Sequence, residues 1–95
     1  FKDVRIPIQI WRSEHGGDGV DPASVAAIAH ALPAAVEFHT VPASQHFDFL
    51  PPCPPEMVKR APEICSDRQS FDRASFHKEF DAQVLAFFRK NLITR

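Results

Sequence analysis

The sequence VRIPIQIW, residues 4–11, alternates apolar and polar side chains. Its apolar residues fall at every second position, at Val4, Ile6, Ile8 and Ile10. Because successive side chains of a strand point to opposite faces, this spacing predicts a β-strand with one strongly apolar face. Pro7 lacks a backbone N–H and removes one donor from the hydrogen-bond ladder of that strand.

A glycine-rich loop and a short amphipathic helix follow the strand. The loop GGDGVDP spans residues 16–22, and within it Asp21 and Pro22 suit the N-cap and the first position of a helix. Apolar residues then recur at helical spacing until Pro33 ends the run, at Val25, Ile28, Ala29 and Leu32. VEFHTV, residues 36–41, predicts a second strand. The short links indicate a βαβ unit with parallel strands.

A long helix is predicted over about residues 73–92. Its apolar side chains form one stripe, made of Phe76, Phe80, Val84, Phe87, Phe88 and Leu92. The fold class is therefore α/β. Parallel strands are normally covered on both faces, so two strands and an aromatic helix predict the carboxyl-terminal βαβ-plus-helix part of a larger sheet, an incomplete domain. The alternative is a small α/β domain that closes by itself or by dimerising.

The composition limits the functional classes. The chain has 95 residues, 44% of them hydrophobic and 24% charged, and 11 Lys and Arg nearly balance 12 Asp and Glu for a net charge of -1. No apolar run reaches the roughly 18 residues of a membrane span, and no basic excess is available to neutralise phosphates. We therefore expect neither a membrane span nor a nucleic-acid partner. Since the chain begins at Phe1, we expect residues 1–95 to be the carboxyl-terminal portion of one longer domain.

Two loops hold the residues best suited to chemistry. In an open α/β sheet, reactive groups lie in loops just after the carboxyl ends of the strands. The first loop presents Asp18, which has no helix-capping role, and the second, VPASQHFDFL, presents His46. A carboxylate beside an imidazole is two-thirds of a nucleophilic triad, because the acid orients the base. By pattern alone, a solvated loop histidine and a turn aspartate remain the alternative interpretation.

Several short motifs resemble one enzyme family. Asp18, Val20 and Pro22 form a D-x-V-x-P pattern, ASQHF at residues 43–47 precedes and follows His46, and VLAFFRKNL ends the long helix. These segments are similar to the last third of an α/β-hydrolase, and most similar to predicted dienelactone hydrolases. In that fold the triad follows in the order nucleophile, acid, histidine.

The resemblance implies a serine or cysteine hydrolase that acts on a carboxylic ester or lactone. It assigns Asp18 as the acid and His46 as the general base, and it implies no cofactor. The sequence departs from the family in one respect, because it holds no G-x-S-x-G or G-x-C-x-G elbow. We therefore expect the nucleophile to lie upstream of Phe1 and this chain alone to be inactive.

A proline- and cysteine-rich loop is expected at about residues 47–71. Five prolines fall between residues 51 and 62, and the two cysteines, Cys53 and Cys65, flank most of them. An even cysteine count in such a loop suits a disulfide, which would indicate a periplasmic or secreted protein. The alternative is a pair of buried thiols in a cytoplasmic protein.

The histidines, the cysteines and the phenylalanine stripe also allow other interpretations. A zinc site built from the cysteines or from His15, Asp18, His39 or His46 lacks ligand pairs at one-turn spacing, so no metal is expected. His30, His39 and His77 are interpreted as structural or solvated. The phenylalanine stripe favours a core, but it also fits a non-catalytic interaction domain. Because the isolated stripe would be exposed, we expect the chain to self-associate or to pair with a missing amino-terminal part.

Overall fold

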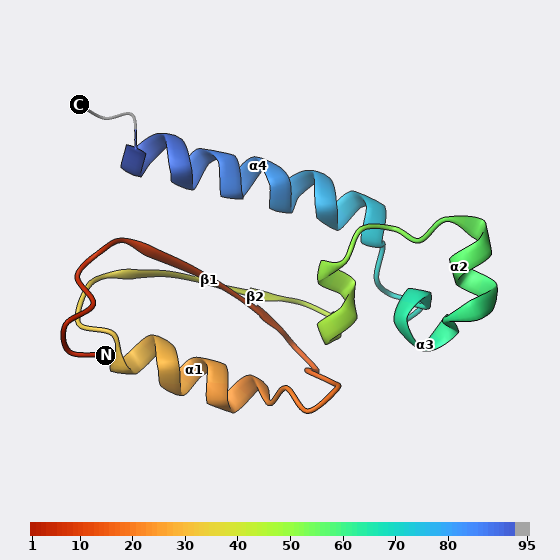
Figure 1. The fold of residues 1–95 in the computed structure, drawn as a ribbon, viewed down its shortest axis with the longest axis horizontal. Coiled ribbons are helices and arrows are strands. Elements are labelled where there is room, and N and C mark those ends of the chain that lie inside the picture. Colours follow the sequence, from red (N-terminus) through yellow and green to blue (C-terminus); the bar gives the residue numbers. More distant parts are fainter. Residues whose placement is uncertain (93–95) are drawn as a thin grey trace.

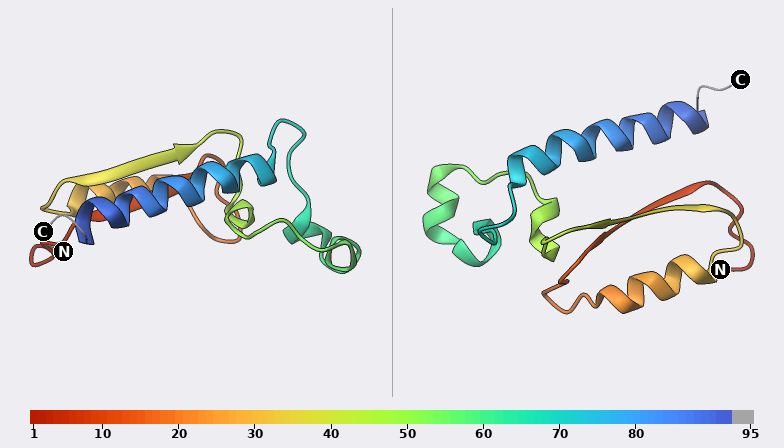
Figure 2. Two further views of the ribbon diagram at one scale, coloured as in Figure 1. Left: turned by 90° about the horizontal axis from the view of Figure 1, so that it is seen from above. Right: turned by 180° about the vertical axis from the view of Figure 1, so that it is seen from behind.

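A computed structural model describes residues 1–92 and shows a two-stranded parallel sheet with one helix on each face (Figure 1). Helices α1 (Pro22–Ala31) and α4 (Arg73–Leu92) lie on opposite sides of the strands, and the short helices lie beyond the carboxyl end of β2 (Val36–Val41) (Figures 1 and 2). In chain order the elements are β1 (Ile8–Ser13), α1 (Pro22–Ala31), β2 (Val36–Val41), the 3-10 helix η1 (His46–Phe49), α2 (Pro55–Arg60), α3 (Pro62–Cys65) and α4 (Arg73–Leu92). The molecule is therefore of mixed α/β class, as predicted.

The first strand begins later than its alternation predicts. We expected it from Val4, but β1 starts at Ile8 and continues to Ser13. Pro7 explains the difference, because it has no N–H to donate to a neighbouring strand. The second strand has its predicted bounds, and the parallel register runs from Ile8 opposite Val36 to Ser13 opposite Val41.

Both long helices lie where the sequence predicts them. Helix α1 begins after Asp21, whose Oδ1 accepts a hydrogen bond from the N–H of Ala23 at 3.1 Å. Its end agrees with the stop predicted before Pro33. Helix α4 occupies the predicted residues 73–92 and runs back along the strands, so that its first turn lies near their carboxyl ends (Figure 2).

The segment expected to be a loop at about residues 47–71 contains short helices. Helices α2 and α3 both begin with a proline, and η1 occupies the start of the segment. Proline is favourable at the first helical position, because the N–H that it lacks would have no intrahelical partner there. The proline cluster thus prevents one long helix but starts two short ones.

The apolar side chains are only partly covered. Val41 is the single hydrophobic residue classed as buried among the described residues. The first half of the predicted stripe packs well, since Phe80 lies edge-on to Trp11 with ring centroids 4.9 Å apart. The second half is open, with Phe88 51% and Leu92 70% exposed. The stripe is therefore covered near the start of α4, while Phe88 and Leu92 near its end are exposed, as expected for a stripe isolated from a larger apolar surface.

Candidate functional site

The loops that follow the two strands are joined by backbone hydrogen bonds. The N–H of His15 donates to the carbonyl oxygen of Ser44 at 3.0 Å, and the N–H of His46 donates to the carbonyl oxygen of Gly16 at 2.8 Å. Both bonds link positions separated by about thirty residues in the sequence and lie just beyond the carboxyl ends of β1 and β2. The parallel sheet therefore brings the Asp18 loop and the His46 loop to one edge.

Asp18 occupies a strained position within a tight glycine turn. Its φ is 49°, in the left-handed region that Asp tolerates better than most residues. The turn is closed by reciprocal backbone bonds between Gly17 and Val20, of 3.2 and 2.9 Å. Gly16 has no room for a side chain, because a Cβ there would collide with the carbonyl oxygen of Val20. The side chain of Asp18 is exposed.

His46 is the first residue of η1 and is half-buried beside the same turn. A Cβ on Gly17 would lie 3.9 Å from the Cβ of His46, which shows how closely the two loops approach. Within residues 1–92 no hydrogen bond joins the carboxylate of Asp18 to the imidazole of His46. The fold brings the two loops together without bonding the two side chains.

Two buried hydroxyl groups lie where these loops cross. The Oγ of Ser44, which is fully buried, donates to the carbonyl oxygen of Val41 at 2.7 Å and accepts from the N–H of Glu14 at 3.3 Å. The Oγ of Ser13 accepts from the N–H of Gly16 at 3.0 Å. Because buried polar groups need partners, these bonds fix the two loops relative to each other.

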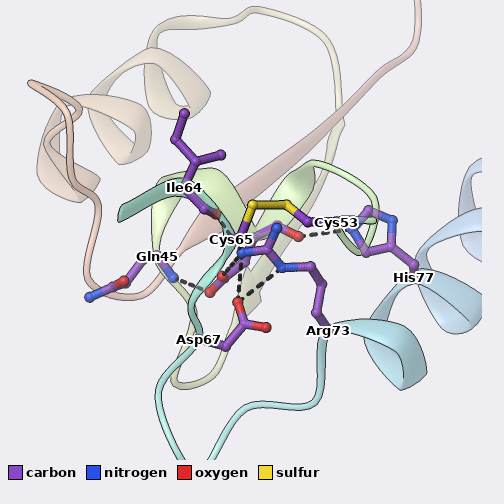
Figure 3. A network of polar contacts seen from close by, with 8 residues as sticks. Gln45, Cys53, Ile64, Cys65, Asp67, Arg73 and His77 are labelled. Atoms are coloured by element: carbon purple, nitrogen blue, oxygen red, sulfur yellow. Dashed lines mark hydrogen bonds and ion pairs between the residues drawn. A yellow bond between two sulfur atoms is a disulfide. The ribbon is translucent and has the colours of Figure 1, made fainter. Parts of the chain in front are cut away.

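A buried ionic cluster joins η1 to the first turn of α4 and to the segment that follows α3 (Figure 3). The carboxylate of Asp48 accepts from the N–H of Gln45 at 2.7 Å and from Nη2 of Arg73 at 3.2 Å. Arg73 also donates to Asp67, from Nε at 2.9 Å and from Nη2 at 2.7 Å, and to the carbonyl oxygen of Ile64 at 2.8 Å. The side chains of Asp48 and Arg73 are only 2% and 4% exposed.

Burial is the main cause that raises the pKa of Asp48, to about 6, and the adjacent carboxylate of Asp67 adds to the effect. The charge of Arg73 and the N–H of Gln45 act in the opposite direction. Two carboxylates share one guanidinium here, so one of them holds a proton more readily than a free aspartate does.

Sequence reasoning missed this cluster. The only signal was the placement of charged residues beside aromatic ones, with Asp48 between Phe47 and Phe49. Such a charge on a 3-10 helix is ordinarily solvated, and only the fold of α4 against η1 buries it. His77, interpreted from the sequence as structural or solvated, is structural, since its Nε2 donates to the carbonyl oxygen of Asp48 at 2.8 Å.

A disulfide ties the proline-rich segment to this cluster. Cys53 and Cys65 are bonded, with their Cα atoms 5.7 Å apart, and the carbonyl oxygen of Ile64 beside Cys65 accepts from Arg73. Figure 3 shows the disulfide directly beside the guanidinium. The covalent link closes the segment from Cys53 to Cys65, and the bond from Arg73 to Ile64 joins the end of this segment to the first turn of α4.

The remaining histidines lie away from this edge. His39 stacks on Trp11 with ring centroids 4.2 Å apart, and its Nε2 lies 2.8 Å from the carboxylate of Glu37. That imidazole is the main cause that lowers the pKa of Glu37. His30 is exposed on α1. Across residues 1–92, no three His, Cys, Asp or Glu side chains are grouped so as to hold a metal ion.

None of the helices in residues 1–92 has the length and apolar character of a membrane span.

Comparison of the chain with known protein families, with curated proteins and with solved structures finds no match in any of the three. The functional interpretation therefore depends on the geometry of this edge and on the motifs that lie there.

Proposed function

We propose that this chain is the carboxyl-terminal part of an α/β-hydrolase, similar to dienelactone hydrolases, and that it supplies the acid and the histidine of a catalytic triad. The pairing of the two loops supports this proposal most directly. Asp18 and His46 follow neighbouring parallel strands in the order acid, then histidine, and the His46 to Gly16 hydrogen bond holds their loops together.

In the proposed reaction, His46 takes a proton from a serine or cysteine nucleophile supplied by another part of the protein. The nucleophile attacks the carbonyl carbon of a carboxylic ester or lactone, and His46 donates the proton to the leaving alkoxide, so that the acyl group stays on the nucleophile. His46 then takes a proton from a water molecule that attacks this acyl group, and it returns the proton to the nucleophile as the carboxylic acid leaves. Asp18 orients the imidazole and stabilises its charged form. The left-handed backbone of Asp18 fits this role, since strained conformations concentrate at functional sites.

The serines and cysteines nearest this edge are already engaged. The hydroxyl groups of Ser13 and Ser44 are buried and hydrogen-bonded to the backbone, and Cys53 and Cys65 are bonded to each other. This agrees with a nucleophile outside the chain. The disulfide also favours a periplasmic or secreted protein over a cytoplasmic one.

The test uses the product of the gene that carries this sequence, assayed on p-nitrophenyl acetate and on a simple lactone. We expect His46→Ala to lower kcat by about three orders of magnitude or more, and Asp18→Asn to lower it by two orders or more. His30→Ala is the matched control and keeps full activity, because His30 is exposed on α1. Full activity of His46→Ala would overturn the proposal.

A second candidate is a non-catalytic interaction domain that uses the end of α4. The observation that favours it is the exposure of Leu85, Phe88 and Leu92 on that helix. Under this alternative the gene product hydrolyses neither compound, and substitutions at Phe88 change its association with partners while His46→Ala does not.

A further inference from the structure

His46 lies in a very short element whose position depends on contacts outside it. The 3-10 helix η1 spans only four residues, His46–Phe49, and so has little stability of its own. Its first residue forms the backbone bond to Gly16 that joins the two loops. Any group that fixes η1 therefore also fixes His46 against the Asp18 loop.

Asp48 belongs to η1 and stabilises its first turn. Its carboxylate accepts from the N–H of Gln45, the residue just before the helix, and its own N–H donates to the carbonyl oxygen of Gln45 at 3.0 Å. These reciprocal bonds close a loop of four residues around His46. The turn that bears the imidazole is thus closed by one bond to the Asp48 side chain and one bond between backbone groups.

Arg73, the first residue of α4, binds the carboxylate of Asp48. Its Nη2 bonds Asp48 and also the segment fixed by the disulfide, through Asp67 and the carbonyl oxygen of Ile64. His77, one turn further along α4, bonds the carbonyl oxygen of Asp48. Three titratable or charged groups, Arg73, Asp67 and His77, therefore lie next to Asp48.

We infer that Asp48, anchored by Arg73, is a positioning residue for His46. It touches neither substrate nor nucleophile in this role, and it acts by holding the η1 turn so that the N–H of His46 stays bonded to Gly16. The inference rests on the proposed function for its catalytic meaning, whereas the positioning itself can be measured in this chain.

Amide hydrogen exchange of the 95-residue chain tests the positioning. In Asp48→Ala we expect the His46 amide to exchange about tenfold faster or more, because the bond to Gln45 is lost, while the amides of β2 keep their protection. Asp48→Asn keeps one of the two acceptor oxygens and places an NH2 group at the other, so its rate is expected to lie between those of the parent and Asp48→Ala and closer to the parent. Asp81→Asn, on the exposed side of α4, is the control for loss of charge.

Arg73→Lys provides a second variant if Asp48→Ala fails to fold. It keeps the positive charge but loses the planar fork that bonds Asp48 and Asp67 together, so the His46 amide is again expected to exchange about tenfold faster. An unchanged His46 exchange rate in a folded Asp48→Ala, or in Arg73→Lys, would overturn the assignment.

Activity of the gene product separates this inference from the proposed function. If both hold, Asp48→Ala lowers kcat on p-nitrophenyl acetate with KM unchanged within about twofold, and Asp48→Asn restores most of it. A gene product with no hydrolase activity, but with His46 exchange that responds to Asp48→Ala, rejects the proposed function and supports the positioning role.

Discussion

The two ends of the sheet are built in opposite ways. At the carboxyl end of the strands the buried side chains are mostly polar, namely Ser13, Val41, Ser44, Asp48 and Arg73. At the amino end no side chain of the described residues is buried, and Ile6, Phe88 and Leu92 are exposed. Exposed apolar side chains also occur beyond the carboxyl end, at Leu50, Met57 and Val58, so the difference between the two ends lies in the buried polar groups. Burying polar groups requires a partner for each, so the carboxyl end has a specific geometry that the open amino end lacks. The most tightly organised part of the chain is therefore the part that carries the candidate site.

The disulfide gives the largest expected effect at the carboxyl end. In Cys53→Ser with Cys65→Ser we expect the free energy of unfolding to fall by about 3 kcal/mol, because the denatured chain regains the freedom of a loop of this length. Urea denaturation measures the change. A reductant should lower the midpoint of the parent chain and leave that of the double variant unchanged. Equal stability of the oxidised parent chain and the double variant would contradict the prediction.

The pH dependence of stability tests the charge cluster. The folded-state pKa of Asp48, about 6, lies above its unfolded value of 3.8, so the folded chain holds the proton more tightly. The resulting stabilisation is full below pH 3.8 and is lost as the pH rises through 6. A shift of this size corresponds to at most about 3 kcal/mol.

Asp48→Asn is the comparison for this effect, since it has no proton to lose. The difference in unfolding free energy between parent and variant, measured from pH 4 to pH 7, should change by up to about 3 kcal/mol and then level off. Contributions from Glu37, whose pKa is lowered by His39, act alike in both proteins and cancel. Parallel pH profiles of the two proteins would show that Asp48 does not titrate in this range.

The buried hydroxyl of Ser44 is expected to give a smaller effect. Ser44→Ala removes the hydroxyl donor to the carbonyl oxygen of Val41, which keeps its bond from the backbone N–H of residue 44, and it leaves the N–H of Glu14 without the hydroxyl acceptor. We expect a cost of about 1–2 kcal/mol of stability. Ser70→Ala, at an exposed position, should change the unfolding free energy by less than about 0.5 kcal/mol. Similar losses in both variants would show that the burial and hydrogen bonds of the Ser44 hydroxyl do not contribute specifically to stability.

The open end should give the smallest change in stability and the clearest change in association. Phe88→Ser with Leu92→Ser is expected to alter the unfolding free energy of the chain by less than about 0.5 kcal/mol, because both side chains are already exposed. We also expect the parent chain to self-associate through this apolar surface and the double variant to do so less, as measured by sedimentation. A monomeric parent chain would show that the exposed side chains of Phe88 and Leu92 do not drive self-association.

Much of the fold could be predicted from local pattern. The bounds of β2 and α4 and the start of α1 follow from alternation, helical spacing and the cap of Asp21. The alternation predicts that β1 starts at Val4, but the strand starts at Ile8. The alternation of apolar residues continues through Pro7, whereas the hydrogen-bond ladder does not. For the candidate site, the sequence indicated Asp18 and His46. It did not indicate Asp48 and Arg73, which hold the turn of His46, because their bond joins residues distant in the chain.

The sequence by itself determined the α/β class, the positions of the regular elements and the two loops in which chemistry is plausible, because all of these depend on neighbouring residues. Only the tertiary structure decided that Asp48 and Arg73 are buried together and that Ser44 lies where the two loops cross. The tertiary structure also decided that the start of the α4 stripe is covered and that Phe88 and Leu92 near its end are exposed. The physical reason is that burial and ion pairing depend on contacts between segments about thirty residues apart, and one sequence carries no local pattern for such contacts.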